Sequence, residues 1–235
     1  MTTFVLVHGA WHGAWCFDAL RSELGSRGHD SLAMDLPCED AEAGCEVYAD
    51  VVAATIGGRE PILVGHSLGG LTISLVPERV KVRGLVYLAA LLPRIGASLR
   101  DQLRDSEPSP IVQSMFDLDY DEQERHWWPR FETANASLYH DCDPQLARAA
   151  FDRLRRQGSR PMTETSPLNH WPDLPSAYIV CSNDHNVSPQ WGRRAARERL
   201  RIEPHELTSD HSPMLSHPAE LAEILDNLAQ QMTSR

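Results

Sequence analysis

Short apolar runs alternate with amphipathic stretches along most of this chain. The runs have the length and β-branched content that are typical of strands buried in a parallel sheet. We expect six such strands, at residues 4–7, 31–34, 61–65, 82–90, 177–181 and 201–207. The spacing of apolar residues between them predicts helices at 15–26, 46–56 and 71–76, one that opens at Ser188, and a last one at 218–230. Strands that return through helices predict an α/β fold with one six-stranded parallel sheet flanked by helices.

The alternation stops within residues 94–172, a polar stretch that is rich in Pro. One helix is predicted there, over residues 144–157, with Asp143 as its N-cap. An insertion of this size between two strands usually serves function. We therefore divide the chain into an α/β core, residues 1–93 and 173–235, and an inserted helical cap.

The motif Gly-x-Ser-x-Gly lies between the third predicted strand and the helix that follows it, with Ser67 at its centre. This arrangement is typical of a nucleophile elbow, a tight turn that exposes the Ser hydroxyl. Gly65 and Gly69 are expected where a side chain would collide with the neighbouring backbone. The following helix directs its N-terminal amides at the site, where they can hold an anion. We therefore predict Ser67 as a nucleophile.

A Ser hydroxyl needs a base to take its proton, and the base needs a carboxylate to orient it. After this type of elbow, the acid and then the His follow in chain order. His211 follows the last predicted strand and Asp184 follows the fifth, so we assign them as base and acid. Asp210 is adjacent to His211, where triad geometry is rare. His217 directly precedes a helix, where a structural role is expected.

An oxyanion hole needs two backbone N–H groups. We assign them to Leu68, directly after the nucleophile, and to Ala10, in the loop after the first strand. The residues expected to line an apolar substrate pocket are Trp11, His12, Trp127, Trp128 and Met214. The alternatives are that the two cap Trp residues pack the cap onto the core, and that His12 lies on the surface.

Net charge and Cys content restrict the classes of partner that the protein is expected to bind. The 235-residue chain carries a net charge of −11 and a single Lys, so it lacks the basic surface that nucleic-acid binding requires. Its five Cys residues, with no Cys-x-x-Cys pair, indicate neither a disulfide framework nor a metal site. The sequence shows no signal peptide and no run long enough to span a membrane. We expect a cytoplasmic protein that binds a small molecule and neither nucleic acid nor membranes. A homodimer remains open.

These motifs together resemble the α/β-hydrolase superfamily. The resemblance is carried by residues 4–15, 65–70, 182–189 and 210–218, and it is closest to the branch of plant methyl esterases, hydroxynitrile lyases and related bacterial esterases. The cap sequence Leu-Tyr-His-Asp-Cys-Asp at residues 138–143 is similar to bacterial esterase-like members. The resemblance implies a sheet without the superfamily's first two strands, and hydrolysis of small esters without a cofactor.

The motifs and the family resemblance together favour a serine esterase. The alternatives are a hydroxynitrile lyase, a lactone or amide hydrolase, and a ligand receptor that turns over poorly. The related lyases carry a Thr directly after the loop His and a Lys directly after the catalytic His. This chain has Gly9 and Ser212 at those positions, which favours the esterase.

Overall fold

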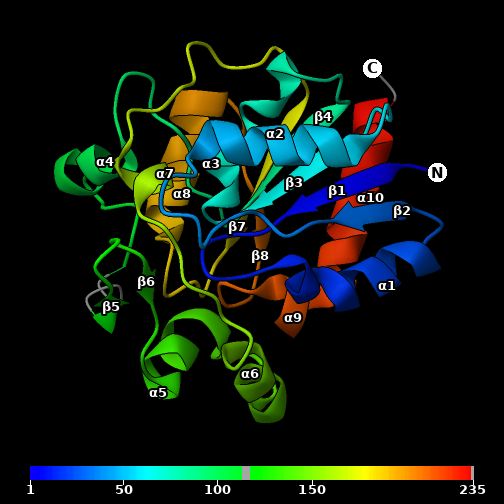
Figure 1. The fold of residues 1–235 in the computed structure, drawn as a ribbon. Coiled ribbons are helices and arrows are strands. Elements are labelled where there is room, and N and C mark those ends of the chain that lie inside the picture. Colours follow the sequence, from blue (N-terminus) through cyan, green and yellow to red (C-terminus); the bar gives the residue numbers. More distant parts are fainter. Residues whose placement is uncertain (113–116, 234–235) are drawn as a thin grey trace.

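The computed structural model describes residues 1–112 and 117–233. Its main sheet has six parallel strands, as predicted, and their order is β2-β1-β3-β4-β7-β8 (Figure 1). Their bounds are β1 Thr3–Val7, β2 Asp30–Ala33, β3 Ile62–His66, β4 Gly84–Leu88, β7 Ser176–Cys181 and β8 His205–Leu207. The strand β8 begins later than residue 201, where we expected it. The reason is that Arg201 adopts a left-handed conformation, with φ of +57°, and ends the preceding helical turn.

Helices cover the sheet. Their bounds are α1 Asp18–Ser26, α2 Cys45–Ile56, α3 Gly69–Ile73, α8 Pro189–Ala195, α9 Pro213–Ser216 and α10 Pro218–Thr233. The helices α1 and α10 pack against each other, and α2 contacts α3 (Figure 1). The apolar side chains of Leu20 and Leu24 on α1, and of Leu221 on α10, are fully buried, as amphipathic spacing requires. No helix in the described part of the chain is long and apolar enough to cross a membrane.

The cap is more varied than the purely helical insertion that we expected. Its elements are α4 Leu99–Asp105, β5 Asp119–Tyr120, β6 His126–Trp127, α5 Phe131–Ala134, the π-turn η4 Asn135–Tyr139, α6 Pro144–Phe151 and α7 Arg160–Thr163. The strands β5 and β6 form a small antiparallel hairpin. The carboxylate of Asp143 caps α6 as predicted, by accepting hydrogen bonds from the backbone N–H of Gln145 and Leu146.

The helix α6 ends at Phe151, although its sequence pattern extends to residue 157. Contacts with distant residues explain the early end. The backbone N–H of Arg155 donates to the Trp11 carbonyl at 2.7 Å, and Gln157 exchanges two backbone hydrogen bonds with His126. These bonds need an extended chain, so docking of the cap overrides the local helical preference.

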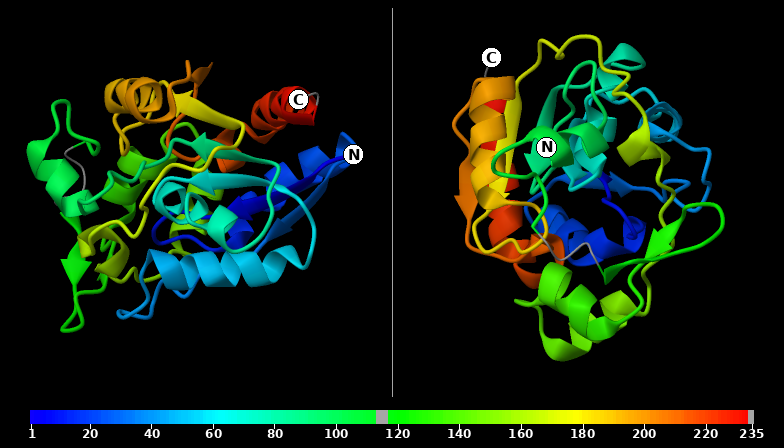
Figure 2. Two further views of the ribbon diagram at one scale, coloured as in Figure 1. Left: turned by 90° about the horizontal axis from the view of Figure 1, so that it is seen from above. Right: turned by 90° about the vertical axis from the view of Figure 1, so that its left-hand side faces the viewer.

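The direction of the strands places the site. All six strands run toward the end of the molecule at which the cap elements gather (Figure 1). Both chain termini lie at the opposite end (Figure 2). Because loops at the carboxyl ends of parallel strands share one edge, the loops after β1, β3, β7 and β8 meet beneath the cap.

Glycine is required where α3 begins. A Cβ atom on Gly69 would lie 2.7 Å from the Val7 carbonyl oxygen and 2.9 Å from that of His8. We therefore expect Gly69→Ala to lower the free energy of unfolding by about 1–3 kcal/mol, because backbone must move to make room. Gly25 in α1 has no neighbour within 4 Å of its Cβ position, so Gly25→Ala should raise that free energy by about 0.5–1 kcal/mol. Urea unfolding of the two variants checks the contrast, and equal effects would contradict it.

Candidate active site

The turn after β3 holds Ser67 in a strained conformation. Its φ is +52°, in the left-handed region that residues other than Gly rarely adopt. The strain is held by backbone hydrogen bonds, since the Ser67 N–H donates to Leu88 and its carbonyl accepts from Leu91. The loop after β1 approaches so closely that a Cβ atom on Gly9 would lie 2.7 Å from the Ser67 Cβ. This is the geometry that the Gly-x-Ser-x-Gly motif predicts.

Asp184 and His211 are brought together from the loops after β7 and β8. The Nδ1–H of His211 donates to Asp184 Oδ2 at 2.8 Å, and both side chains are almost completely buried. The other carboxylate oxygen of Asp184 accepts from the backbone N–H groups of Asn186 and Val187, at 2.7 and 2.9 Å. The carboxylate is therefore fixed by its own loop, and it leaves the Nε2 atom of His211 as the nitrogen that can act as a base.

His66 connects the serine turn to the loop that carries His211. Its Nε2–H donates to the His211 carbonyl oxygen at 2.8 Å, and the two ring centroids are 4.7 Å apart. Burial lowers the pKa of His66 well below its ordinary value, so the ring is neutral. No hydrogen bond joins Ser67 Oγ to His211 Nε2 in the described structure. Such catalytic hydrogen bonds often form only when substrate binds.

The backbone N–H groups of Ala10 and Leu68 donate to no other group within the described residues, although both residues are buried. Buried N–H groups without a partner are rare, so these two are available to a ligand. Their residues lie in the two loops that meet at Ser67. This arrangement can stabilise an oxyanion, and that Ala10 and Leu68 do so stays a prediction.

His8 orients the first of these donors. Its Nδ1–H donates to the Gly9 carbonyl at 2.8 Å, while its Nε2 accepts from the Leu36 N–H at 2.9 Å. The Gly9 carbonyl and the Ala10 N–H belong to one trans peptide group and point in opposite directions. The ring therefore aims the Ala10 N–H away from itself. Burial lowers the pKa of His8 to about 4, which keeps the ring neutral and this hydrogen-bond pattern intact.

His12 is buried, so the surface position that we left open for it is wrong. Its Nδ1 lies 2.8 Å from the Ala10 carbonyl, and its Nε2 lies 2.7 Å from the Tyr139 hydroxyl in the cap. Burial lowers the pKa of His12 to about 3. Met214 is also fully buried, on α9 just beyond His211. That these two residues line the pocket stays a prediction.

Three aromatic residues expected in the pocket have different surroundings. Trp11 has a positive φ of +63°, and its ring lies 5.5 Å from that of Trp128, edge to face. The Trp11 indole N–H donates to His126 Nδ1 at 3.0 Å. Trp127 is half-buried beneath the guanidinium of Arg156, 4.3 Å from its ring centroid. Trp128 packs against Trp11 in the loop after β1, so it is the stronger candidate of the two cap Trp residues for lining the pocket.

The sequence analysis did not identify His126 and Tyr139, two cap residues whose side chains hydrogen bond to the loop after β1. Each is separated from its partner by more than a hundred positions. A lone His or Tyr in a polar stretch carries no signal for such a contact, because either is equally common on a cap surface.

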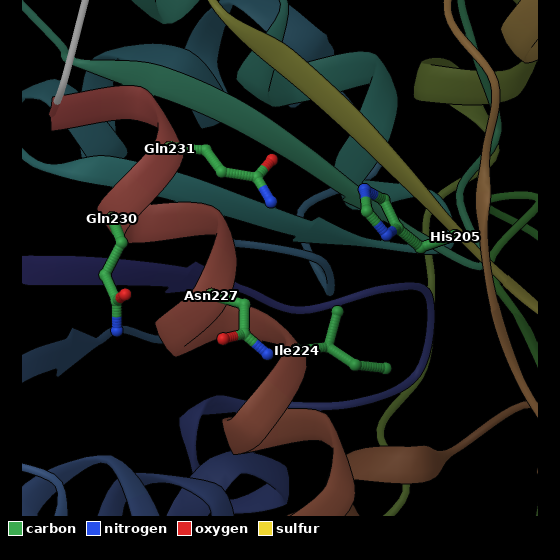
Figure 3. A pocket seen from close by; sticks show the side chains of 5 residues that line it. All are labelled: His205, Ile224, Asn227, Gln230 and Gln231. Carbon is green, nitrogen blue, oxygen red and sulfur yellow. The ribbon is translucent and has the colours of Figure 1, made fainter.

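A cavity of about 570 Å³ between β8 and α10 is not part of this site (Figure 3). It is lined by His205, Ile224, Asn227, Gln230 and Gln231. His205 is the first residue of β8, so the cavity lies toward the end of the sheet away from the catalytic loops. Within residues 1–112 and 117–233, no group of three or more His, Cys, Asp or Glu side chains is arranged to hold a metal ion.

The buried His residues predict how stability depends on pH. Burial lowers the pKa from 6.5 to about 4 for His8 and His126, and to about 3 for His12. Below pH 6.5 the unfolded chain therefore binds protons that the folded chain cannot. As the pH is lowered from about 6.5 toward 4, the free energy of unfolding therefore falls. At pH 5 each of these three His residues lowers it by about 2 kcal/mol. Urea unfolding at pH 7 and pH 5 checks this, and equal stabilities would contradict it. The His12→Asn variant should lose less stability between pH 7 and pH 5, because the contribution of His12 is removed.

Comparisons with known proteins agree with this structure. The sequence profile of the Alpha/beta hydrolase family matches residues 4–224. Probable esterase PIR7A from Oryza sativa subsp. japonica is 30% identical over 257 residues, covering 96% of this chain and 96% of the relative. Methyl jasmonate esterase 1 from Vitis vinifera is 28% identical over 251 residues, covering 97% and 96%.

A solved structure shows the same fold. The pyrethroid hydrolase from Sphingobium faniae JZ-2 superposes with a TM-score of 0.83 at 24% identity, covering 100% of this chain and 99% of that chain. Because the profile match runs over nearly the whole chain and the fold agrees with it, the chain belongs to the alpha/beta hydrolase family.

Proposed function

We propose that this protein is a serine carboxylic-ester hydrolase that acts through Ser67, His211 and Asp184. The observation that carries the proposal is the buried 2.8 Å hydrogen bond between His211 Nδ1 and Asp184 Oδ2, from loops on the same edge of the sheet as the strained Ser67. This bond sets the tautomer in which Nε2 has a free lone pair, the form that a general base requires. The names of the relatives, which are esterases, support an ester as the bond that is cleaved.

The reaction begins with attack of Ser67 Oγ on the ester carbonyl carbon. His211 Nε2 takes the hydroxyl proton as the new C–O bond forms, and Asp184 stabilises the resulting imidazolium. The negative charge that develops on the carbonyl oxygen is held by the N–H groups of Ala10 and Leu68, each worth about 3 kcal/mol in such sites. Collapse of the intermediate breaks the bond to the alcohol, which leaves with the proton from His211.

Water then completes the cycle. His211 Nε2 takes a proton from a water molecule, and the oxygen attacks the acyl carbon on Ser67. The same two N–H groups hold the second oxyanion. Its collapse breaks the bond to Ser67 Oγ, which recovers its proton from His211, and the carboxylic acid leaves. No cofactor takes part in these steps.

The proposed substrates are small, neutral esters with an apolar acyl or alcohol group. The aromatic contact of Trp11 with Trp128 places apolar surface beside the loop that carries Ala10. Methyl jasmonate esterase 1 is named for a methyl ester, so small methyl esters belong among the first substrates to test. A panel of chromogenic short-chain esters, together with a serine-directed fluorophosphonate probe, tests the proposal.

Two positions favour the esterase over cyanohydrin cleavage. A Cβ atom on Gly9 would lie 2.7 Å from the Ser67 Cβ and 3.1 Å from His66 Nδ1, so a hydroxyl-bearing side chain does not fit without backbone movement. Ser212, directly after His211, is fully buried and uncharged. Cyanide leaves as an anion, and neither residue supplies the positive charge that would stabilise it in a site of low dielectric constant.

The two Asp residues near His211 should differ sharply in effect. Asp184→Asn should lower kcat on p-nitrophenyl acetate by about 10³- to 10⁴-fold, because the amide favours the wrong imidazole tautomer. Asp210→Asn should lower it by less than about tenfold, since the Asp210 carboxylate bonds the backbone N–H groups of Asp141 and Ser212 rather than the His211 ring. Ser67→Ala is the inactive reference. The reverse order of the two Asn variants would show that Asp210 is the acid.

Lyase activity is tested directly. We expect the purified protein to release no cyanide from mandelonitrile or acetone cyanohydrin above the buffer blank while it hydrolyses small esters. Cyanide is measured colorimetrically for the wild type and for Ser67→Ala. Cyanide release that depends on Ser67 and exceeds ester turnover would replace the esterase by the lyase.

A further inference from the structure

One short cap segment, residues 139–142, contacts all three loops that carry the proposed catalytic groups. We call it the clamp segment. Tyr139 reaches the loop after β1, His140 reaches the loop after β7, and Asp141 and Cys142 reach the loop after β8. Its sequence is the cap motif Tyr-His-Asp-Cys, to which the proposed reaction assigns no role.

The first contact runs from Tyr139 through His12 to Ala10. The Ala10 carbonyl can only accept a hydrogen bond, so His12 Nδ1, 2.8 Å away, carries the ring proton. The ring is neutral, so Nε2 is an acceptor, and the Tyr139 hydroxyl donates to it at 2.7 Å. The cap thus sets the orientation of the peptide that follows Ala10. His8 holds the peptide that precedes it.

The second contact is a stack of two imidazole rings. His140 and His185 lie face to face, with centroids 4.0 Å apart and an angle of 14° between the planes. His185 directly follows Asp184, and its Nδ1 lies 3.0 Å from the Ala136 carbonyl in the π-turn η4. The clamp segment and η4 together hold the loop that positions the proposed acid.

The third contact is made to the Asp210 carboxylate. Its Oδ2 accepts from the Asp141 backbone N–H at 3.1 Å and from the Cys142 thiol at 3.8 Å. Its Oδ1 accepts from the Ser212 N–H at 3.1 Å and from the Ser216 hydroxyl at 2.8 Å. The carboxylate thereby joins the clamp segment to both sides of His211. This explains why a buried acid stands next to the proposed base without bonding its ring.

We propose that the clamp segment positions the three catalytic loops relative to one another, and that the Tyr139 hydroxyl is a positioning group for the oxyanion hole. The inference rests on the proposed function, since it concerns how that site is assembled. Tyr139 touches His12 rather than the reacting atoms, so it acts through the peptide that follows Ala10, and this peptide adjoins the Gly9–Ala10 peptide that carries the donor N–H. Its role is to keep one N–H donor aimed at the transition state, in which small displacements are costly.

The test removes only the hydroxyl. In Tyr139→Phe the ring remains, but His12 Nε2 loses its donor and the ring is free to turn. We expect kcat on a small ester to fall about tenfold with KM unchanged within twofold, because the oxyanion hole serves the transition state rather than bound substrate. A boronic acid, which forms a tetrahedral adduct on the serine, should bind about tenfold more weakly.

Tyr48→Phe is the matched control. Tyr48 is a buried Tyr of the core, and its hydroxyl accepts a hydrogen bond from the cap residue Gln157 at 3.1 Å. This variant also loses one hydroxyl between cap and core, but the hydroxyl contacts none of the three catalytic loops. We expect its kcat and boronic acid affinity to stay within twofold of the wild type.

A double-mutant cycle shows whether Tyr139 acts through His12. If it does, Tyr139→Phe combined with His12→Asn should lower kcat by much less than the product of the two single effects. Independent effects would overturn the proposed route. So would equal behaviour of Tyr139→Phe and Tyr48→Phe, or a raised KM with unchanged kcat. Ser67→Ala is measured alongside, because retained activity in that variant would reject the proposed function itself rather than this inference.

Discussion

The contact between the loop after β1 and the turn after β3 is the constraint on which the rest of the site depends. The two strands are neighbours in the sheet, so their loops meet without any side chain between them. Gly9 leaves space for Ser67, and Gly69 leaves space for the carbonyls of Val7 and His8. This approach brings the loop that carries Ala10 close to the turn that carries Ser67 and Leu68. A larger residue at either glycine would move the loop that carries Ala10 away from Ser67.

Neutral His side chains then give this backbone its orientation. His8, His12 and His66 each donate from one ring nitrogen to a backbone carbonyl, and each is kept neutral by burial. A neutral imidazole is well suited to this task, because it offers one donor and one acceptor at opposite sides of a rigid ring. A charged His8 or His12 ring would donate on both sides and lose its second partner. Because burial keeps these rings neutral, the fold loses stability at low pH.

The cap contributes polar contacts as well as apolar cover. Trp128 packs on Trp11, but Tyr139, His126 and Arg155 also hydrogen bond to the loop after β1. The cap therefore helps to decide where the backbone of the core lies, in addition to covering the loop after β1. Variation in the cap would accordingly alter transition-state stabilisation as well as substrate choice.

The sequence by itself determined the sheet, the nucleophile turn and the loops that carry Asp184 and His211. These depend on local periodicity, on a glycine-bounded turn and on chain order, which are all visible along the chain. Tertiary structure alone decided that His12 is buried, that Asp210 bonds the cap, and that α6 ends at Phe151. Each of these follows from a partner far away in sequence. The physical reason is that a polar side chain or a helix end takes the hydrogen bonds that docking of the cap makes available, and no local pattern records which partners those are.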